Sequence, residues 1–432
     1  MSHRSRQLRV SALARIEGEG ALDVVVEDGH VLDARLRIYE PPRFFEAFLR
    51  GRQYTEATDI TSRICGICPV AYQASAWNAI EDACGVTVSG PIAALRRLLY
   101  CGEWISSHAL HIYLLHAPDF LGYPDVVALA RDHRDLVERG LRLKKAGNAV
   151  LEAVGGRAIH PVNTRVGGFY RAPSPQELAG LGETLRRALD DALATVTWVA
   201  GFDFPDAELD CDLLAVSAGD QYPIEGGGLI AAASGLEFPP AEFGRHVTEH
   251  QVPHSTALHA TLDGHGYLTG PLARYSISSA LLSPAARQAA TAAGLGPTCR
   301  NPFLSIVVRA VEVVYAITEA LRIIDDYQPP DPPFAEVPPV AGTGHGVSEA
   351  PRGLLYHRYQ TGAAGQIEAA VIVPPTSQNQ AAIEADLRRT VGAHLDLDDA
   401  GLTALCERTI RNYDPCISCS AHFLELTVRR QD

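Results

Sequence analysis

The chain has 432 residues, of which 47 % are hydrophobic and 20 % are charged, and its formal net charge is −14. This composition is that of a globular protein with a sizeable core, and the acidic balance argues against nucleic acid as a ligand, because phosphate binding needs a basic surface. The apolar stretch 303–324 carries charged residues at helical intervals, so we expect no membrane span.

The first half of the chain is expected to start with a β-hairpin and to continue as a series of helices. Residues 21–39 alternate apolar and polar side chains around Asp28-Gly29, which is the pattern of a hairpin. A short helix over 44–50 follows. Longer helices are predicted over 70–83, 91–116, 125–137, 142–154 and 176–199, delimited mostly by Gly and Pro.

The second half is expected to mix strands with helices. Strands and loops are predicted over 212–275, helices over 304–326 and 380–391, an extended Pro-rich connection over 328–339, and strands over 353–359 and 367–373. The predicted fold class is mainly α with a smaller β part (α+β), as a central bundle of long helices with an N-terminal β-hairpin and short C-terminal strands. Within one subunit, 1–432, we expect a hairpin part (1–60), a helical core (61–327) with a β insertion at about 205–275, and a C-terminal lobe (340–432).

Two Cys-x-x-Cys pairs lie near opposite ends of the chain, Cys65 with Cys68 and Cys416 with Cys419. Four thiolates gathered from distant segments suit a soft or borderline metal, whereas the pairs of a zinc ribbon stand roughly 15–20 residues apart. A chain of this length needs no metal to build its core, so the pairs predict a redox-active thiolate metal centre. A structural zinc, an iron–sulfur cluster and two disulfides are the alternatives. The other cysteines are expected to be buried thiols: Cys84, Cys101, Cys211, Cys299 and Cys406.

The residues around these cysteines resemble a known family. The motifs are Arg63-Ile64-Cys65-Gly66-Ile67-Cys68 and Asp414-Pro415-Cys416 with Cys419 and His422. Together with Ala14–Gly18, Gly156–Pro161, Gly270–Arg274 and Glu349–Gly353, they resemble, in the same order, segments of the large, catalytic subunit of nickel–iron hydrogenases. The resemblance implies the fold of that subunit and the reversible heterolytic cleavage of dihydrogen to protons and electrons.

The resemblance also implies roles for the cysteines. Cys65 and Cys416 would be terminal nickel ligands, and Cys68 and Cys419 would bridge nickel to an iron that carries carbon monoxide and cyanide. The segment Pro374, Pro375 and Thr376 would contact the cyanide ligands. Pro375 stands where some relatives have a hydroxyl, so Thr376 or backbone N–H groups would have to serve.

Two charged residues are implied to act at this centre. Glu17 matches the family's relay glutamate, which takes over a proton first received by the Cys416 thiolate; the alternative is a simple ion pair with Arg15. Arg352 matches an arginine held over the vacant coordination position, and Asp414 would fix its guanidinium. The alternative for Arg352 is a purely structural ion pair with Asp414.

The resemblance also implies a magnesium ion held by Glu46, His422 and the backbone carbonyl of Val371, although a His ligand is unusual for this cation. Three positions depart from many family members and favour the soluble, cofactor-linked branch: Glu19, Tyr72 and Ser107. A further group of histidines in the helix 91–116 is expected to be a buried polar seam instead of a metal site: His108, His111 and His116.

Partners follow from what the sequence lacks. It has no Gly-x-Gly-x-x-Gly fingerprint and no spare cysteine set, so we expect this chain itself to bind no nicotinamide and no iron–sulfur cluster. Electrons would pass to an iron–sulfur small subunit and through diaphorase-type subunits to NAD(P), although a deazaflavin or polysulfide acceptor stays open. The resemblance also implies nickel-insertion proteins and a maturation protease, which we expect to remove the tail 423–432 after His422.

The N-terminal residues lack the apolar core of a signal peptide, so we expect a cytoplasmic location, unless the chain is exported bound to a partner. Two other functions stay open at this point. One is a non-catalytic scaffold related to the quinone-side subunit of respiratory complex I, and the other is a structural four-thiolate zinc protein.

Overall fold

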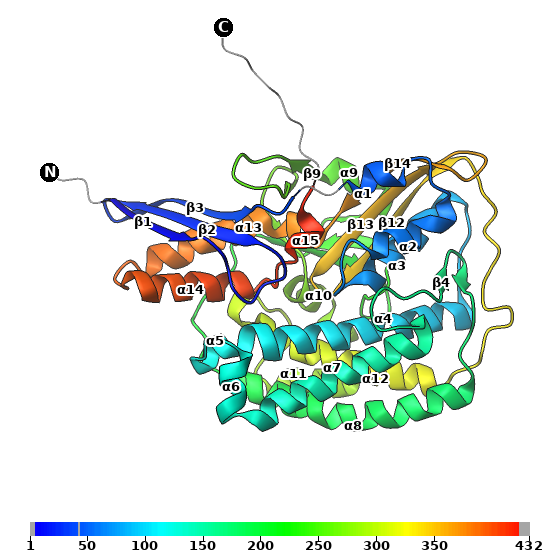
Figure 1. Cartoon of the computed structure of the whole chain (residues 1–432), viewed down its shortest axis with the longest axis horizontal. Coiled ribbons are helices and arrows are strands. Elements are labelled where there is room, and N and C mark those ends of the chain that lie inside the picture. The colour runs from blue at the N-terminus through cyan, green and yellow to red at the C-terminus, as the bar shows by residue number, and fades with distance from the viewer. Residues whose placement is uncertain (1–4, 42–43, 423–432) are drawn as a thin grey trace, which may run out of the picture.

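The computed structural model describes residues 5–41 and 44–422, and its long helices form one layer beneath the strands (Figure 1). The helices of this layer are α4 (Gly90–Leu110), α7 (Arg134–Gly155), α8 (Pro175–Ala200) and α12 (Ser305–Asp325). Helices α4 and α7 pack closely through glycines: a Cβ at Gly147 would lie 2.6 Å from the backbone nitrogen of Ser106. Shorter helices flank the layer: η2 (His111–His116, π-helical), α5 (Ala117–Leu121), α6 (Val126–Asp132) and α11 (Pro284–Ala292).

One predicted helix boundary is wrong. The sequence predicts helices over 125–137 and 142–154, but the chain breaks at His133, and α7 then runs without interruption from Arg134 to Gly155. Gly140 lies inside α7, where the absence of a side chain makes room for the Tyr113 ring: a Cβ at this position would collide with that ring. This glycine allows close packing and does not end a helix.

The C-terminal half forms an antiparallel sheet of β12 (Gly342–Ala350), β13 (Gly353–Thr361) and β14 (Ile367–Val373). Helix α3 (Pro69–Ala83) packs on β12, where a Cβ at Gly344 or Gly346 would collide with the α3 backbone. Strand β12 was not predicted, because its glycine-rich start lacks the apolar alternation of a strand. The last helices are α13 (Pro375–Ala393), α14 (Asp399–Arg411) and α15 (Ile417–Ser420).

The predicted N-terminal hairpin is confirmed as β2 (Gly20–Glu27) and β3 (His30–Ile38). Strand β1 (Ser5–Val10) pairs with β2 and makes the sheet three-stranded. This sheet packs against α13, which starts at Pro375, earlier than the predicted 380, because proline is well suited to the first turn of a helix. Helices α11 and α14 were not predicted.

The remaining strands are short, as expected for 212–275. They are β6 (Asp212–Ser217), β7 (Leu229–Ala232), β8 (Glu237–Phe238), β9 (Val247–His250), β10 (His259–Leu262) and β11 (Tyr267–Leu268), with β4 (Thr164–Arg165) and β5 (Gly168–Phe169) earlier in the chain. Short helices complete the fold: α1 (Phe45–Leu49), η1 (Tyr54–Glu56), α2 (Ala57–Ser62), η3 (Pro240–Glu242), α9 (Phe243–His246), α10 (Pro271–Ser278), η4 (Ser279–Leu281) and η5 (Pro302–Leu304). Helices thus outweigh strands, in agreement with the predicted class, while the division into 1–60, 61–327 and 340–432 stays a prediction.

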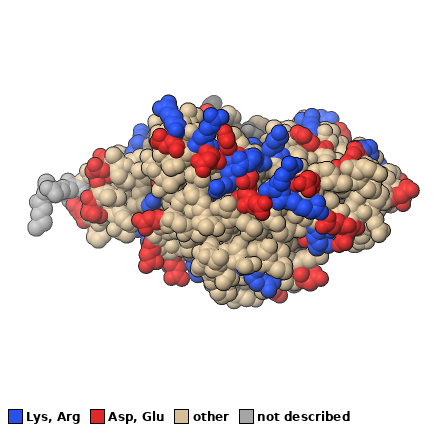
Figure 2. All heavy atoms as spheres, turned by 90° about the horizontal axis from the view of Figure 1, so that it is seen from below, with Lys and Arg blue, Asp and Glu red and all other residues tan. Residues whose placement is uncertain are grey.

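Acidic and basic side chains are intermixed on the helical side of the molecule (Figure 2). Ion pairs connect its helices, with Arg142 of α7 bonded to Asp191 of α8 and Arg186 of α8 bonded to Asp325 of α12. Among the described residues, no helix is both long enough and apolar enough to span a membrane.

Candidate metal centre

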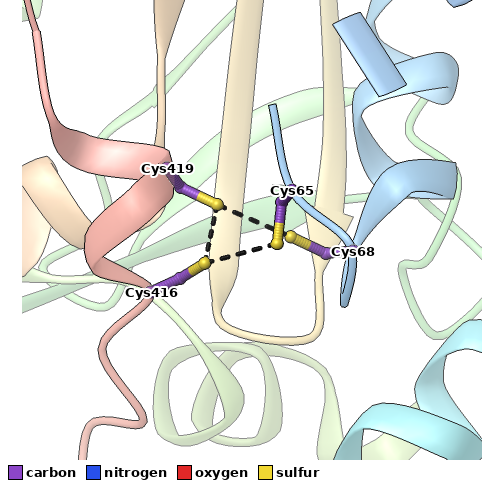
Figure 3. Close-up of side chains that lie close together, drawn as sticks. All are labelled: Cys65, Cys68, Cys416 and Cys419. Atoms are coloured by element: carbon purple, nitrogen blue, oxygen red, sulfur yellow. Dashed lines mark hydrogen bonds between the residues drawn. The ribbon is translucent and has the colours of Figure 1, made fainter. Parts of the chain in front are cut away.

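The two Cys pairs meet in one buried site between the segment before α3 and helix α15 (Figure 3). The Sγ atoms of Cys65 and Cys416 are 3.4 Å apart, and those of Cys68 and Cys419 are 3.8 Å apart. Thiolates bound to one ion at about 2.3 Å lie at most roughly 4.6 Å from each other. The expected convergence of the four sulfurs is therefore found in the structure.

The first pair is held by the start of α3. The buried Glu103 of α4 accepts hydrogen bonds from the backbone N–H groups of Val70 and Ala71, at 2.6 and 3.0 Å. These N–H groups belong to the first turn of α3 and have no partner within the helix. Burial raises the pKa of Glu103 well above its ordinary value. Glu103 thus fixes the helix start directly after Cys68.

The second pair is held by contacts from distant parts of the chain. The N–H of Cys416 donates to Thr376 Oγ1 (2.9 Å), at the start of α13. The N–H of Ile417 donates to the carbonyl of Glu17 (3.0 Å). The second contact joins residues 400 positions apart, so this half of the site is complete only when the two ends of the chain come together.

Arg352 and Asp414 form a buried pair beside the sulfurs. The Nη2 of Arg352 lies 3.1 Å from Asp414 Oδ1, and its Nε donates to the Asp414 carbonyl at 2.8 Å. Although burial opposes the charge, Asp414 and the neighbouring Cys416 hold the pKa of Arg352 well above its ordinary value. Its Nη1 and Asp414 Oδ2 are buried and have no hydrogen-bond partner among the described residues.

The turn that carries Arg352 is clamped by a second buried arginine. Arg274 donates to the carbonyls of Ala350 (2.7 Å) and Pro351 (3.1 Å). Its guanidinium is itself bonded to Glu312 and Glu349, each at 2.9 Å. This network gives a physical reason for two of the motifs, Gly270–Arg274 and Glu349–Gly353.

Glu17 also lies beside Cys416 and is half-buried. Its Oε2 is 3.1 Å from Cys416 Sγ and accepts a hydrogen bond from the N–H of Ser418 at 3.0 Å. Arg15 pairs with Asp119 and not with Glu17, so the alternative of a simple Arg15–Glu17 ion pair is wrong. The hydroxyl of Ser418 donates in turn to Glu40 (3.3 Å). Sequence reasoning missed both Ser418 and Glu40.

The residues expected to bind magnesium lie close to Cys419. His422 Nε2 is 3.4 Å from Glu46 Oε2, and Glu46 Oε1 accepts from the N–H of Ile372, which follows Val371. A cavity of about 200 Å³ is lined by Glu46, His422 and Cys419. Glu249 of β9 belongs to the same group and was missed by sequence reasoning; burial raises its pKa to about 7.

The other sequence-predicted residues also surround the sulfurs. Pro374 lines the cavity beside Cys419, and Pro375 and Thr376 are buried at the start of α13. Tyr72 is buried, and its hydroxyl has no hydrogen-bond partner within 5–41 and 44–422. Burial and the charge of Cys419 raise the pKa of Tyr72 well above its ordinary value.

The buried polar seam predicted for the histidines of α4 and η2 is confirmed, because His108, His111 and His116 are all buried. His108 lies 2.9 Å from Glu312, and His111 is bonded to the carbonyl of Arg411. The prediction for the remaining cysteines is partly wrong. Three of them are buried, but Cys84 and Cys211 are half-exposed, since one caps the end of α3 and the other precedes a short strand.

The residues present fit a cationic metal centre. Four sulfurs packed this closely and out of contact with water cannot all carry a negative charge without a cation among them. Burial raises the pKa of Cys416 and of Cys419, which shows the cost of charging them without a metal. Arg352 Nη1 and the Tyr72 hydroxyl, which have no partner in the described part of the chain, add hydrogen-bond donors near the cysteines.

Comparison with known proteins gives a consistent result. The family model described as nickel-dependent hydrogenase matches residues 43–172 and 296–422. The chain is 35 % identical over 423 residues to the sulfhydrogenase 1 subunit alpha of Pyrococcus furiosus, covering 97 % of this chain and 98 % of that protein. It is 30 % identical to the NAD-reducing hydrogenase HoxS subunit beta of Cupriavidus necator, covering 97 % and 95 %.

A solved structure is similar along nearly the whole chain. The crystal structure of an NAD⁺-reducing nickel–iron hydrogenase in the H₂-reduced state superposes with a TM-score of 0.83 at 27 % identity. The match covers 96 % of this chain and 99 % of that chain. The predicted fold is therefore confirmed.

Proposed function

The chain belongs to the nickel-dependent hydrogenase family, and on this premise we propose how its residues serve the catalytic large subunit of an oxidoreductase acting on dihydrogen. The observation that carries the proposal is the single buried site formed by Cys65, Cys68, Cys416 and Cys419. Cys65 and Cys416 would hold nickel, and Cys68 and Cys419 would bridge it to an iron with carbon monoxide and cyanide ligands. When bound, this pair supplies the heterolytic splitting of dihydrogen.

The protein's own contribution is to place one fixed charge and one mobile proton beside Cys416. Arg352 brings a positive charge close to the cysteines, with an Nη1 donor that has no partner among the described residues, and this charge is fixed before the reaction begins. Asp414 orients the guanidinium. Glu17 lies within hydrogen-bond distance of Cys416 Sγ, so a proton on that sulfur passes directly to the carboxylate.

From Glu17 the proton moves toward solvent. Ser418 lies next to Glu17, and its hydroxyl contacts the half-buried Glu40. In the described structure Glu17 is bonded to the backbone N–H of Ser418 and not to its hydroxyl, so a proton would pass from the Glu17 carboxylate to that hydroxyl through a bridging water and from there to Glu40. The sequence alone suggested only the first member of this route.

Electrons would leave through partner subunits. The proposal assigns them to an iron–sulfur small subunit and then to diaphorase-type subunits that reduce NAD(P), in the cytoplasm. It is supported by the similarity to the NAD-reducing relative and to the NAD⁺-reducing structure. Purification of the complex with a co-eluting iron–sulfur subunit and H₂-dependent NAD(P) reduction tests this step. A complex that reduces only another acceptor would overturn it.

A magnesium ion between Glu46, His422 and the Val371 carbonyl is part of the proposal. It is supported by the short distance between Glu46 and His422. The proposal also includes nickel-insertion proteins and a maturation protease. The tail 423–432 on which the protease would act lies outside the described residues. The intact mass of the nickel-loaded chain shows whether a protease has removed residues 423–432, as we expect.

The main test is metal analysis of the purified complex. We expect nickel and one associated iron in equal amounts in this chain, with infrared bands of carbon monoxide and cyanide and with H₂/D₂ exchange. A Cys65→Ser variant should lose nickel and exchange together. A single zinc ion without these infrared bands would overturn the proposal in favour of a structural zinc protein, and a metal-free chain would favour a scaffold.

A further inference from the structure

A second group of metal-ligating side chains lies away from the four cysteines. His254, His259 and Glu384 each offer one ligand atom, and these atoms all lie within 4.8 Å of one another. His254 belongs to the loop between β9 and β10, His259 begins β10, and Glu384 lies on α13. Two imidazoles and one carboxylate form a donor set that zinc and similar divalent cations prefer.

The geometry of this group is already close to that of a ligand set. The Nε2 of His254 is 2.8 Å from Glu384 Oε1, which also accepts the N–H of Leu36 at 3.0 Å. The rings of His254 and His259 lie 5.5 Å apart and are nearly perpendicular. Nitrogen and oxygen ligands of a tetrahedral ion stand about 3.3 Å apart at the usual bond lengths. Small side-chain movements would therefore bring these three ligand atoms to the distances that a bound ion requires.

A buried ring nitrogen of His259 has no hydrogen-bond partner among the described residues. His259 is only 4 % exposed, and its Nε2 makes no hydrogen bond to the residues that the structure describes. A buried polar atom without a partner costs roughly 1–3 kcal/mol. A cation between His254, His259 and Glu384 would remove that cost.

We infer that His254, His259 and Glu384 bind one zinc ion, or a divalent cation of the same class, at a site separate from the four cysteines. His254 is half-buried, so the fourth position is accessible to water. Burial lowers the pKa of His259 to about 4, so its ring is neutral near pH 7, as a metal ligand must be.

The ion would fix the loop that holds the last described residues. The carbonyl of Thr256 accepts the N–H of His422 at 3.1 Å, and Ala257 pairs with Ala421. Thr256 also bonds to the end of β3, at the carbonyl of Ile38. Loop 251–258 thus connects β3 and α13 to the segment after Cys419. Zinc would act here by holding this loop in place, and no catalytic role is needed.

The experiment uses the nickel-loaded complex, purified without a polyhistidine tag, treated briefly with chelator, supplied with Zn²⁺ and desalted. We expect about one zinc per chain in the parent. Zinc should fall at least tenfold in His259→Ala and His254→Gln, while nickel and iron stay unchanged. His265→Ala removes an exposed histidine near β10 and should keep the zinc. X-ray absorption at the zinc edge should show imidazole nitrogen and oxygen ligands.

Two outcomes overturn the inference. One is zinc at background level in a parent complex whose nickel content is full. The other is zinc that persists in His259→Ala or shows sulfur ligands, which would place it at the cysteines. Hydrogen exchange adds an independent readout, because zinc should slow amide exchange in 251–258 and 417–422 in the parent but not in His259→Ala. Equal exchange with and without zinc would contradict the anchoring role.

Discussion

The two charged groups that flank Cys416 are held in opposite ways. Arg352 is buried and bonded to Asp414, and its turn is fixed by Arg274. Glu17 is half-buried, and within the described structure its carboxylate is bonded to Cys416 Sγ and to the N–H of Ser418, whose hydroxyl bonds to Glu40. A charge that must stay fixed benefits from a rigid, hydrogen-bonded surrounding, whereas a group that moves protons needs a route outward. The same cysteine is therefore close to both a stationary charge and a proton-transfer group.

The largest effect is expected from the transfer side. In Glu17→Gln the amide keeps the shape and still accepts from Ser418 N–H, but it cannot carry a proton. We expect H₂/D₂ exchange to fall by about 10²–10⁴-fold, with nickel and iron content unchanged. Glu19→Gln, at an exposed position two residues away, is the matched control and should behave like the parent. Normal exchange in Glu17→Gln would assign the relay to another residue.

A smaller loss is expected when the fixed charge is kept but its geometry is removed. Lysine in Arg352→Lys cannot reproduce the two bonds to Asp414 and the further Nη1 donor of the guanidinium. Turnover with an artificial electron acceptor should fall by roughly 10²–10³-fold, while metal content and unfolding temperature stay close to those of the parent. Arg358→Lys, exposed on the same strand β13, is the control. If Arg352→Lys retains full turnover, a positive charge at this position is sufficient for activity, and the planar geometry of the guanidinium has no role.

How much of this arrangement the sequence predicted depends on how local each signal is. The Cys pairs, Glu17 and Arg352 stand inside short motifs, and the hairpin and most long helices follow from periodicity. Glu103, which caps α3, and Arg274, which clamps the Arg352 turn, act on residues far away in the chain. Contacts of that kind depend on the packed fold and have no local pattern, so their roles appeared only in the structure.

Asp414 tests whether the Arg352 side depends on orientation alone. Its φ of 50° is one that asparagine tolerates, so Asp414→Asn keeps the backbone and one of the two oxygens. We expect turnover to fall roughly 10- to 100-fold, as for other residues that orient a group at a metal site. In a double variant with Arg352→Lys the losses should combine less than additively, because both changes remove the same interaction. Fully additive losses would show that Asp414 acts independently of Arg352.

The smallest effect is expected at Ser418, and it decides where the proton goes after Glu17. Ser418→Ala removes the hydroxyl bond to Glu40 but leaves the backbone N–H that binds Glu17. A lost hydrogen bond of about 0.5–1.5 kcal/mol corresponds to a two- to tenfold slower exchange, and Glu40→Gln should slow exchange to a similar degree. Ser420→Ala is the control, since the Ser420 hydroxyl bonds only to the Ile417 carbonyl in the described structure. Loss of that bond affects stability but not the proposed proton route. If Ser418→Ala and Ser420→Ala both exchange at the parent rate, protons leave Glu17 by a different path. The comparison of the fixed charge of Arg352 with the proton-transfer group then concerns Glu17 alone, without Ser418 and Glu40.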